Sequence, residues 1–273
     1  MASTGGREAL AEASERLTAD TASATFAQLA AVADEIWAVA GLLRTQPRLR
    51  RALTDPSRSG EERAALIRSL VSGKLSKVAV DVVATLVAGR WSAPNELLDA
   101  TERLGVEVML RSADKAGDLA EVEDELFRFG QLVAANPELA VTLSDPGAAQ
   151  ERRVKLVQDL LKGKVRLATG RLVEVALEGF GGRSFEGSLT RLVELTAAKR
   201  DREVAYVTVA RLLDETEEER LAAKLSDIYG RQVSLKIEVD PRVIGGVSVR
   251  VGSDLYDGTI LRRLNEAKQA FAQ

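Results

Sequence analysis

The sequence contains neither cysteine nor histidine. Their absence excludes disulfide bonds, thiol nucleophiles, metal sites built on Cys or His, and any catalytic step that needs an imidazole. The net charge is only −3, so no overall field attracts nucleic acid or an anionic membrane. The first residues lack the pattern of a secretion signal, and no uninterrupted apolar run approaches the ~20 residues of a membrane span. We therefore expect membrane association only through another protein.

Helix-forming residues are abundant instead. Ala, Leu, Val, Glu and Arg dominate, while aromatic residues make up only 4% of the chain. Apolar residues recur in steps of three and four between Arg7 and Lys199, which is typical of amphipathic helices. A length of 273 residues allows two or three modest domains. The sequence therefore predicts a mostly helical protein. Trp37 and Trp91 are expected in its core, and the less favoured alternative is that one of them partly lines a binding groove.

A pattern of turns and apolar positions occurs twice in the chain. The matching positions, each 90 residues apart (124 − 34, for example), are Asp34 and Asp124, Pro47 and Pro137, Asp55 and Asp145, and Gly73 and Gly163. Repeated stops in one ungapped register indicate duplication of a whole helical domain. The first copy starts with its own short helix, Arg7 to Leu17. The second has no separate equivalent unless a helix from Pro94 to Arg111 serves both.

The composition changes at Arg202, where β-branched residues begin to alternate with other residues. Strands are predicted at 204–209, 233–239 and 247–251, and 254–256 is a candidate for a fourth. Thr216 is expected to cap a helix that ends at Gly230, and Thr259 a final helix. We predict an α+β fold that is mostly α: a first helical bundle at 1–112, a second at 113–201, and a small β-α-β-β-α domain at 202–273.

No group of residues in the sequence forms a recognisable active site. Gly163-Lys164 lacks the preceding strand and the hydroxyl of a phosphate-binding loop, so it is interpreted as a helix-ending turn. Neighbouring carboxylates such as Asp34 and Glu35 point in different directions on a helix. The basic residues between Arg152 and Arg171 lack the interleaved aromatic residues of a nucleic-acid site, and acidic residues flank them. A solvated helix face is the favoured interpretation, and a salt-bridging protein interface is the second choice. We therefore predict no catalytic residue, no metal site and no cofactor.

The stretch from Asp240 to Leu264, DPRVIGGVSVRVGSDLYDGTILRRL, resembles the C-terminal signature of the delta subunit of F-type ATP synthases. This family includes the mitochondrial oligomycin-sensitivity-conferring protein. The resemblance covers residues from about 118 to the end, in the family's order of helical domain and then α/β domain. The first helical copy, which precedes this region, is additional to the ordinary arrangement of the family. The segments TDPSR at Thr54 and EVEDELFRFG at Glu121 look like the longer form found in actinobacteria.

The resemblance implies a non-catalytic stator subunit on the cytoplasmic side of the plasma membrane. In the family, a helical domain takes up N-terminal helices of the alpha subunits, partly in a groove between its first and fifth helices. The C-terminal domain binds the b subunits of the peripheral stalk, and neither nucleic acid nor direct membrane contact is implied. The candidate groove residues are Leu10, Ala13, Leu17, Val82 and Leu86 in the first copy, and Leu172, Val175 and Ala176 in the second.

For the stalk contact, the resemblance implies the C-terminal domain. The candidate residues are Ile244, Val249, Arg250, Leu261 and Leu264. A runner-up function from a different class is a helical RNA-binding regulator of the antitermination type, which would bind RNA with an affinity that falls as salt rises.

Overall fold

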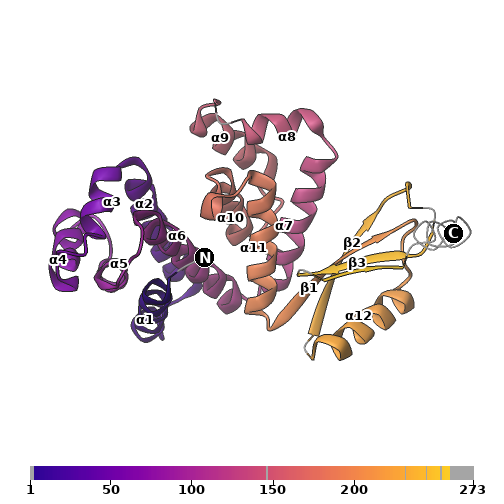
Figure 1. Ribbon diagram of the computed structural model, residues 1–273. Helices are drawn as coiled ribbons and strands as arrows, with labels where there is room; N and C mark the ends of the chain where they lie inside the picture. Colours follow the sequence, from indigo (N-terminus) through magenta and orange to yellow (C-terminus); the bar gives the residue numbers. More distant parts are fainter. Residues whose placement is uncertain (1–2, 146, 231, 244, 253, 259–273) are drawn as a thin grey trace, which may run out of the picture. The chain divides into compact units, whose positions relative to one another are not determined.

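The structure is a computed structural model that describes residues 3–145, 147–230, 232–243, 245–252 and 254–258. The chain divides into two compact units, Met1–Leu189 and Thr190–Gln273. The first unit is helical and the second contains a small sheet (Figure 1). The expected fold class, α+β and mostly α, is thereby confirmed. The domain boundaries at 112 and 201 stay predictions.

Prolines and glycines set many of the helix ends. The helices before the sheet are α1 (Thr4–Asp20), α2 (Phe26–Thr45), α3 (Pro47–Leu53), α4 (Gly60–Val71), α5 (Lys77–Ala88), α6 (Pro94–Ala116), α7 (Leu119–Ala134), α8 (Pro137–Ser144), α9 (Gln150–Leu161), α10 (Leu167–Leu177), the 3₁₀ turn η1 (Phe180–Gly182) and α11 (Phe185–Lys199). Pro47 and Pro137 open α3 and α8, where a missing N–H costs no helical hydrogen bond. Gly117 ends α6 in the left-handed conformation.

The helix bounds recur with the spacing seen in the sequence. α4 and α9 are offset by 90 at both ends, since 150 − 60 and 161 − 71 give the same value. α3 and α8 start 90 residues apart, and so do α5 and α10. When α1 is shifted by 90 it falls on 94–110, inside α6. We call α1 to α6 the first copy and α6 to α11 the second copy, because α6 is the last helix of one and the first of the other.

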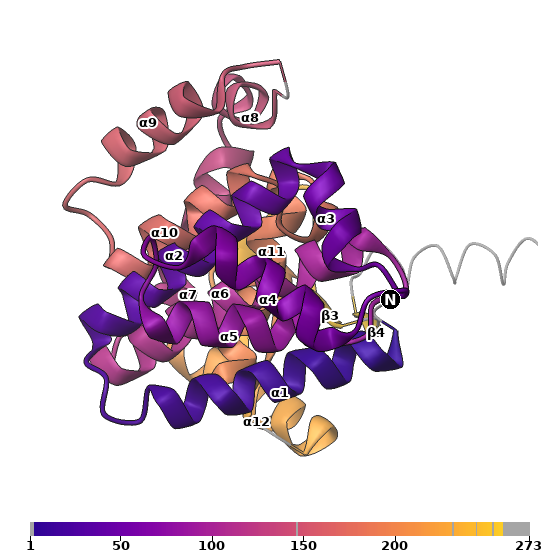
Figure 2. The same cartoon turned by 90° about the vertical axis from the view of Figure 1, so that its left-hand side faces the viewer.

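The shared helix α6 is buried on several sides. It contacts α1, α2, α3 and α5 of the first copy, and α7, α10 and η1 of the second. Figure 2 shows it in the middle of these helices, with α1 and α5 running together below it. Leu97, Leu104 and Met109 are completely buried. A helix with apolar residues around most of its surface is typical of such a central position.

In each copy the second helix caps the fifth. The Glu35 carboxylate on α2 accepts a hydrogen bond from the backbone N–H of Ser76 at 3.1 Å. The Glu125 carboxylate on α7 accepts one from the backbone N–H of Arg166 at 2.9 Å. Both bonds satisfy a donor that would otherwise lack a partner at a helix start. The duplication therefore extends to side-chain contacts.

Replacing Glu35 with alanine should lower the free energy of unfolding by about 1 kcal/mol, because the start of α5 loses a charged acceptor. Hydrogen exchange followed by NMR should show faster exchange of the Ser76 amide. The matched variant Glu125→Ala should speed exchange at Arg166 and leave Ser76 as it was. Unchanged exchange at Ser76 in the Glu35 variant would contradict the assignment of this cap.

The C-terminal unit is a four-stranded mixed sheet with a helix packed on it. Its elements are β1 (Arg202–Val209), α12 (Glu215–Tyr229), β2 (Gln232–Val239), β3 (Val247–Val251) and β4 (Asp254–Asp257), in the sheet order β2-β1-β3-β4. β1 and β2 are parallel, joined through α12, and the other pairs are antiparallel. Ala205, Val207 and Val249 form the core with Leu225 of α12.

The structure corrects the helix cap that was predicted in this unit. The cap of α12 is Asp214, not Thr216: Asp214 accepts from the Glu217 N–H, and the Glu217 side chain accepts from the Asp214 N–H. This reciprocal pair is a capping box, which the spacing of Asp214 and Glu217 favours. The final helix predicted from Thr259 lies outside the described residues.

Candidate interaction surfaces

The predicted groove of the first copy lies where α1 packs against α5. Leu10 is half-buried. The other four predicted residues, Ala13, Leu17, Val82 and Leu86, are completely buried. The two helices approach so closely that a Cβ on Gly89 would lie 2.1 Å from the Cβ of Ala9. Four of the five residues therefore belong to the core, and Leu10 is the one that offers surface to a partner.

Charged residues span the outer side of this contact. Asp81 on α5 lies 3.5 Å from Arg16 on α1, 3.3 Å from Lys77 and 4.0 Å from Arg68 on α4. The cations are largely solvated, so each pair adds little to stability. They surround one carboxylate, and a partner that lies along α1 and α5 would meet them.

A hollow of about 390 Å³ lies at one end of the α1–α5 contact. The end of α1, one side of α2 and the first turn of α5 form its walls. Val32 and Val78 supply apolar surface, while Asp20, Gln28 and Glu35 supply polar groups. Such a hollow can accept one apolar side chain from a helix whose neighbouring residues are polar.

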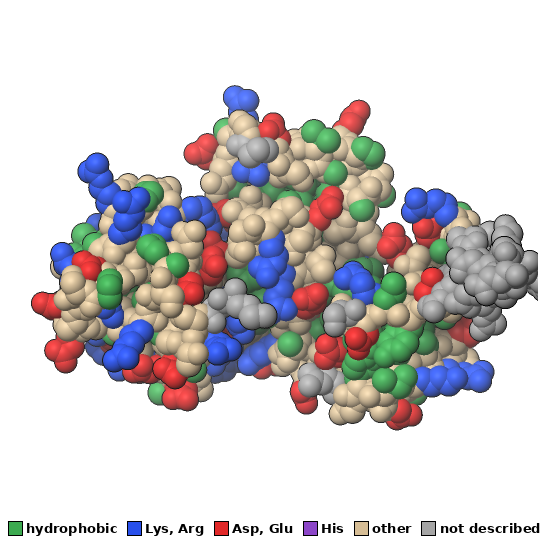
Figure 3. All heavy atoms as spheres, viewed as in Figure 1, with side chains coloured by type: hydrophobic (Ala, Val, Ile, Leu, Met, Phe, Trp, Pro, Cys, Tyr) green, Lys and Arg blue, Asp and Glu red, His purple; other side chains and the backbone are tan. Residues whose placement is uncertain are grey.

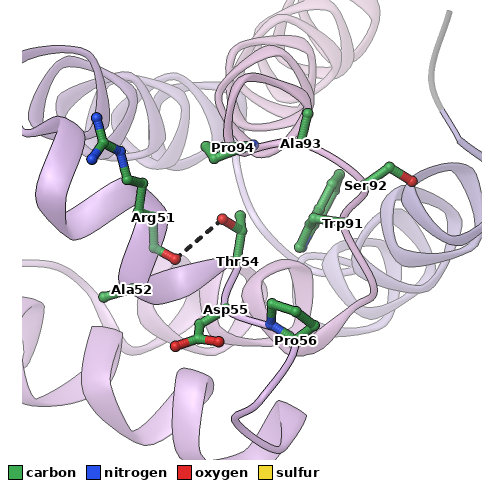
Figure 4. A pocket seen from close by; sticks show the side chains of 9 residues that line it. All are labelled: Arg51, Ala52, Thr54, Asp55, Pro56, Trp91, Ser92, Ala93 and Pro94. Carbon is green, nitrogen blue, oxygen red and sulfur yellow. Dashed lines mark hydrogen bonds between the residues drawn. The ribbon is translucent and has the colours of Figure 1, made fainter.

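A second hollow, of about 420 Å³, lies at the opposite end of the first copy (Figure 4). The end of α3 and the turn after it face the connection from α5 to α6, and Thr54 donates a hydrogen bond to the Arg51 carbonyl oxygen at 3.3 Å. Trp91 is nine-tenths buried yet forms part of the wall. It is thus both a core residue and a lining residue. Trp37, also predicted in the core, is only half-buried, and its Nε1 donates a hydrogen bond to the Glu102 carbonyl oxygen at 3.3 Å.

The predicted residues of the second copy, Leu172, Val175 and Ala176, lie together on α10. All three are buried. α10 packs against α9, α7 and the shared helix α6, so these residues serve the core of the second copy.

The predicted stalk residues divide into three groups. Val249 is buried in the core of the C-terminal unit. Arg250 on β3 is exposed, and its guanidinium carbon lies 4.8 Å from the centre of the Tyr206 ring, a cation–π contact. Ile244, Leu261 and Leu264 lie outside the described residues.

The exposed apolar residues of the C-terminal unit were not predicted from the sequence. Leu255 and Tyr256 on β4 are 63% and 45% exposed, and Ile228 on α12 is 62% exposed. Figure 3 shows green side chains gathered on this unit. Hydrogen bonds to Tyr256 and Asp254, together with burial, raise the pKa of Tyr229 above its usual range, so its hydroxyl stays protonated beside β4. Edge strands with exposed apolar residues are common interaction sites.

The described residues were also considered as metal ligands and as membrane spans. Among the described residues, no cluster of three or more acidic side chains could hold a metal ion. Within the same residues, α2 alone is long and apolar enough to cross a membrane by length and composition. It packs along α6 and buries Leu29, Ala33 and Ile36. Its apolar character is that of a core helix.

The chain matches one described protein family over more than half of its length. The family model "ATP synthase delta (OSCP) subunit" matches residues 107–271. This match begins inside the shared helix α6 and covers the second copy and the C-terminal unit. A solved chain in the cryo-EM structure of the Toxoplasma gondii mitochondrial ATP synthase hexamer is 18% identical, with a TM-score of 0.39; the match covers 62% of this chain and 95% of that one.

Curated relatives match the first copy as well. "ATP synthase subunit delta" of Salinispora arenicola is 63% identical over 267 residues, which are 98% of this chain and 97% of that protein. The protein of the same name in Streptomyces avermitilis is 44% identical over 97% of both chains. The longer form with the additional N-terminal copy is therefore shared by these relatives.

Proposed function

Because the chain belongs to the ATP synthase delta (OSCP) subunit family, we propose that it joins the peripheral stalk to the top of the catalytic head and so keeps the head from turning with the rotor. Subunits of this family are non-catalytic components of a membrane-associated complex. The observation that carries the proposal is the 63% identity to a delta subunit over 98% of the chain. No observation favours the RNA-binding alternative.

The proposed head contact is the outer side of α1 and α5. An amphipathic N-terminal helix of an alpha subunit would lie along them, since helix-in-groove binding needs an apolar floor and flanking charges. Leu10 and the hollow between α1, α2 and α5 supply apolar surface, and the cations around Asp81 supply charge. Ala13, Leu17, Val82 and Leu86 support this surface from below.

The proposed stalk contact is the C-terminal unit. Leu255 on the edge strand β4 offers apolar surface, and Arg250, its partner on the adjacent β3, offers a cation on the same face of the sheet. The end of the b subunits would cover this surface. The complex would then hold the chain at the cytoplasmic side of the plasma membrane without direct membrane contact.

Two surface variants test these contacts separately. Leu10→Glu should weaken binding to the isolated alpha/beta head at least about tenfold and leave binding to b unchanged, because a charge enters an apolar contact. Leu255→Glu should do the reverse. Leu70→Glu, at a 38% exposed position on α4, is the matched control and should change neither affinity.

Surface plasmon resonance with purified head and purified b subunit measures both affinities. Full head binding by the Leu10 variant would reject the α1–α5 surface. Val82→Asp would not test this surface. Val82 is completely buried, so a carboxylate there would unfold the first copy and abolish head binding even if the α1–α5 surface were not the contact.

A further inference from the structure

The two copies meet at a group of charged side chains in the first half of the shared helix. Arg44 on α2 donates one hydrogen bond to the Glu102 carboxylate on α6 at 2.7 Å and another to the Glu178 carboxylate, which follows α10. The other Glu102 oxygen accepts the backbone N–H of Gly181 in η1 at 2.9 Å. We call Arg44, Glu102, Glu178 and the Gly181 N–H the inter-copy clasp.

The centre of the clasp is shielded from water. The Glu102 side chain is only 5% exposed, and that of Arg44 is 30% exposed. Burial acts to lower the pKa of the Arg44 guanidinium, but its hydrogen bonds to Glu102 and Glu178 outweigh this and raise the pKa above the ordinary value. The guanidinium is therefore charged, and each Glu102 oxygen has a donor. Burying a carboxylate is costly unless its oxygens accept hydrogen bonds, and both Glu102 oxygens do.

The repeat itself does not account for these residues. The position equivalent to Glu102 in the first copy is Glu12 (102 − 90), which is exposed on α1. The equivalents of Arg44 and Glu178 are Ala134 and Ala88 (44 + 90 and 178 − 90), which cannot form ion pairs. Among the described residues, the combination of these three charged side chains therefore occurs once, where one copy touches the other. This placement argues for a role in joining the copies rather than in folding each of them.

A second ion pair connects the same two helices further along. Arg171 on α10 lies 3.3 Å from Asp34 on α2. Burial raises the pKa of Asp34, and Arg171 offsets part of that rise. Asp34 and Arg44 are about 15 Å apart along α2, and Arg171 and Glu178 about 10 Å apart along α10, at 1.5 Å per residue. The Arg171–Asp34 pair is partly exposed and adds little by itself, but it gives a second point of attachment in the same order along both helices.

We propose that the inter-copy clasp makes the two copies one rigid arm, with Glu102 as the positioning residue that holds α2, α6 and η1 together. A single ion pair permits rotation, whereas a buried carboxylate bonded to two elements, supported by the Arg171–Asp34 pair, does not. The shared helix already prevents separation of the copies, and the clasp prevents bending about it. This inference does not depend on the stator role, but that role would gain stiffness from it.

The distance between spin labels in the full chain tests this. The natural sequence has no cysteine, so labels attach only where cysteine is introduced. One pair, Ser69→Cys on α4 with Lys155→Cys on α9, reports across the copies. A second pair, Glu15→Cys on α1 with Ser69→Cys, reports within the first copy. All three positions are exposed.

With an intact clasp, both pairs should give narrow distance distributions in pulsed electron paramagnetic resonance. Glu102→Gln, which leaves one donor without an acceptor, should widen the distribution across the copies at least about twofold and leave the one within the first copy unchanged. Glu12→Gln, the equivalent change in the first copy, should widen neither. Arg44→Lys should act like Glu102→Gln, because an ammonium on a flexible stem does not reproduce the guanidinium fork that bridges two carboxylates.

Three results would overturn the proposal. The first is an unchanged distribution across the copies in both clasp variants. The second is a distribution across the copies that is already much wider than the one within the first copy when the clasp is intact. The third is equal widening of both pairs in both variants, which would mean that the clasp supports folding of the helices and does not set the angle between the copies.

Discussion

Replacing Arg63 with leucine should lower the free energy of unfolding of the helical unit by about 3 kcal/mol. The Arg63 side chain is buried between the α3–α4 turn and the end of α5. Its guanidinium donates to the backbone carbonyl oxygens of Arg58 at 2.8 Å, Gly89 at 2.8 Å, Ala88 at 3.0 Å and Asp55 at 3.1 Å. Leucine would leave these shielded acceptors without donors, and each unsatisfied acceptor costs free energy.

The second copy supplies the control for this prediction. Arg153 is the repeat equivalent of Arg63, is only half-buried, and donates to Leu143 at 3.1 Å and Leu177 at 3.3 Å. Arg153→Leu should therefore cost about 1 kcal/mol. Urea unfolding followed by far-ultraviolet circular dichroism measures both. Equal losses for the two variants would show that the number of carbonyl partners does not set the cost.

Gly105→Ala should destabilise the helical unit by about 2 kcal/mol although alanine is the better helix former. A Cβ at Gly105 on α6 would lie 2.3 Å from Nε1 and 2.5 Å from Cδ1 of the Trp37 ring on α2. The ring would have to move, since real Cβ atoms do not come so close to other atoms. It would lose its hydrogen bond to Glu102, and α2 would separate from α6.

Gly41→Ala is the matched change. Gly41 also lies inside a helix, but a Cβ there meets no atom within 4 Å. We expect a gain of roughly 0.5–1 kcal/mol from helix propensity alone. Thermal unfolding monitored by tryptophan fluorescence compares the two variants. A Gly105 variant that gained stability like the Gly41 variant would mean that α2 and α6 do not approach as closely as described.

The repeat and the helix ends were predictable because their signals are local. A proline such as Pro47 or a glycine such as Gly73 acts on its own neighbours, so its effect can be predicted from a few residues. The sharing of one helix by both copies could be inferred because the second copy has no separate first helix in the sequence. The cap of α12 was misplaced because Asp214 and Thr216 are both capping residues, and only the partner Glu217 distinguishes them.

The surfaces were harder to predict, for a physical reason. An apolar stripe such as Ala13, Leu17 and Val82 has the same period whether it faces the chain's own core or a partner helix. Most of the predicted groove residues turned out to be buried within the chain. The clasp left no signal at all, because Glu102 and its partners Arg44 and Glu178 come together only in the folded chain.

The central claim is that this chain connects the stalk to the head. The direct measurement is cosedimentation of purified b subunit with purified alpha/beta head, with and without the chain. We expect b to sediment with the head only when the chain is added, in a stoichiometric complex of all three. Sedimentation of b with the head in its absence, or failure of the chain to bind either component, would contradict the account.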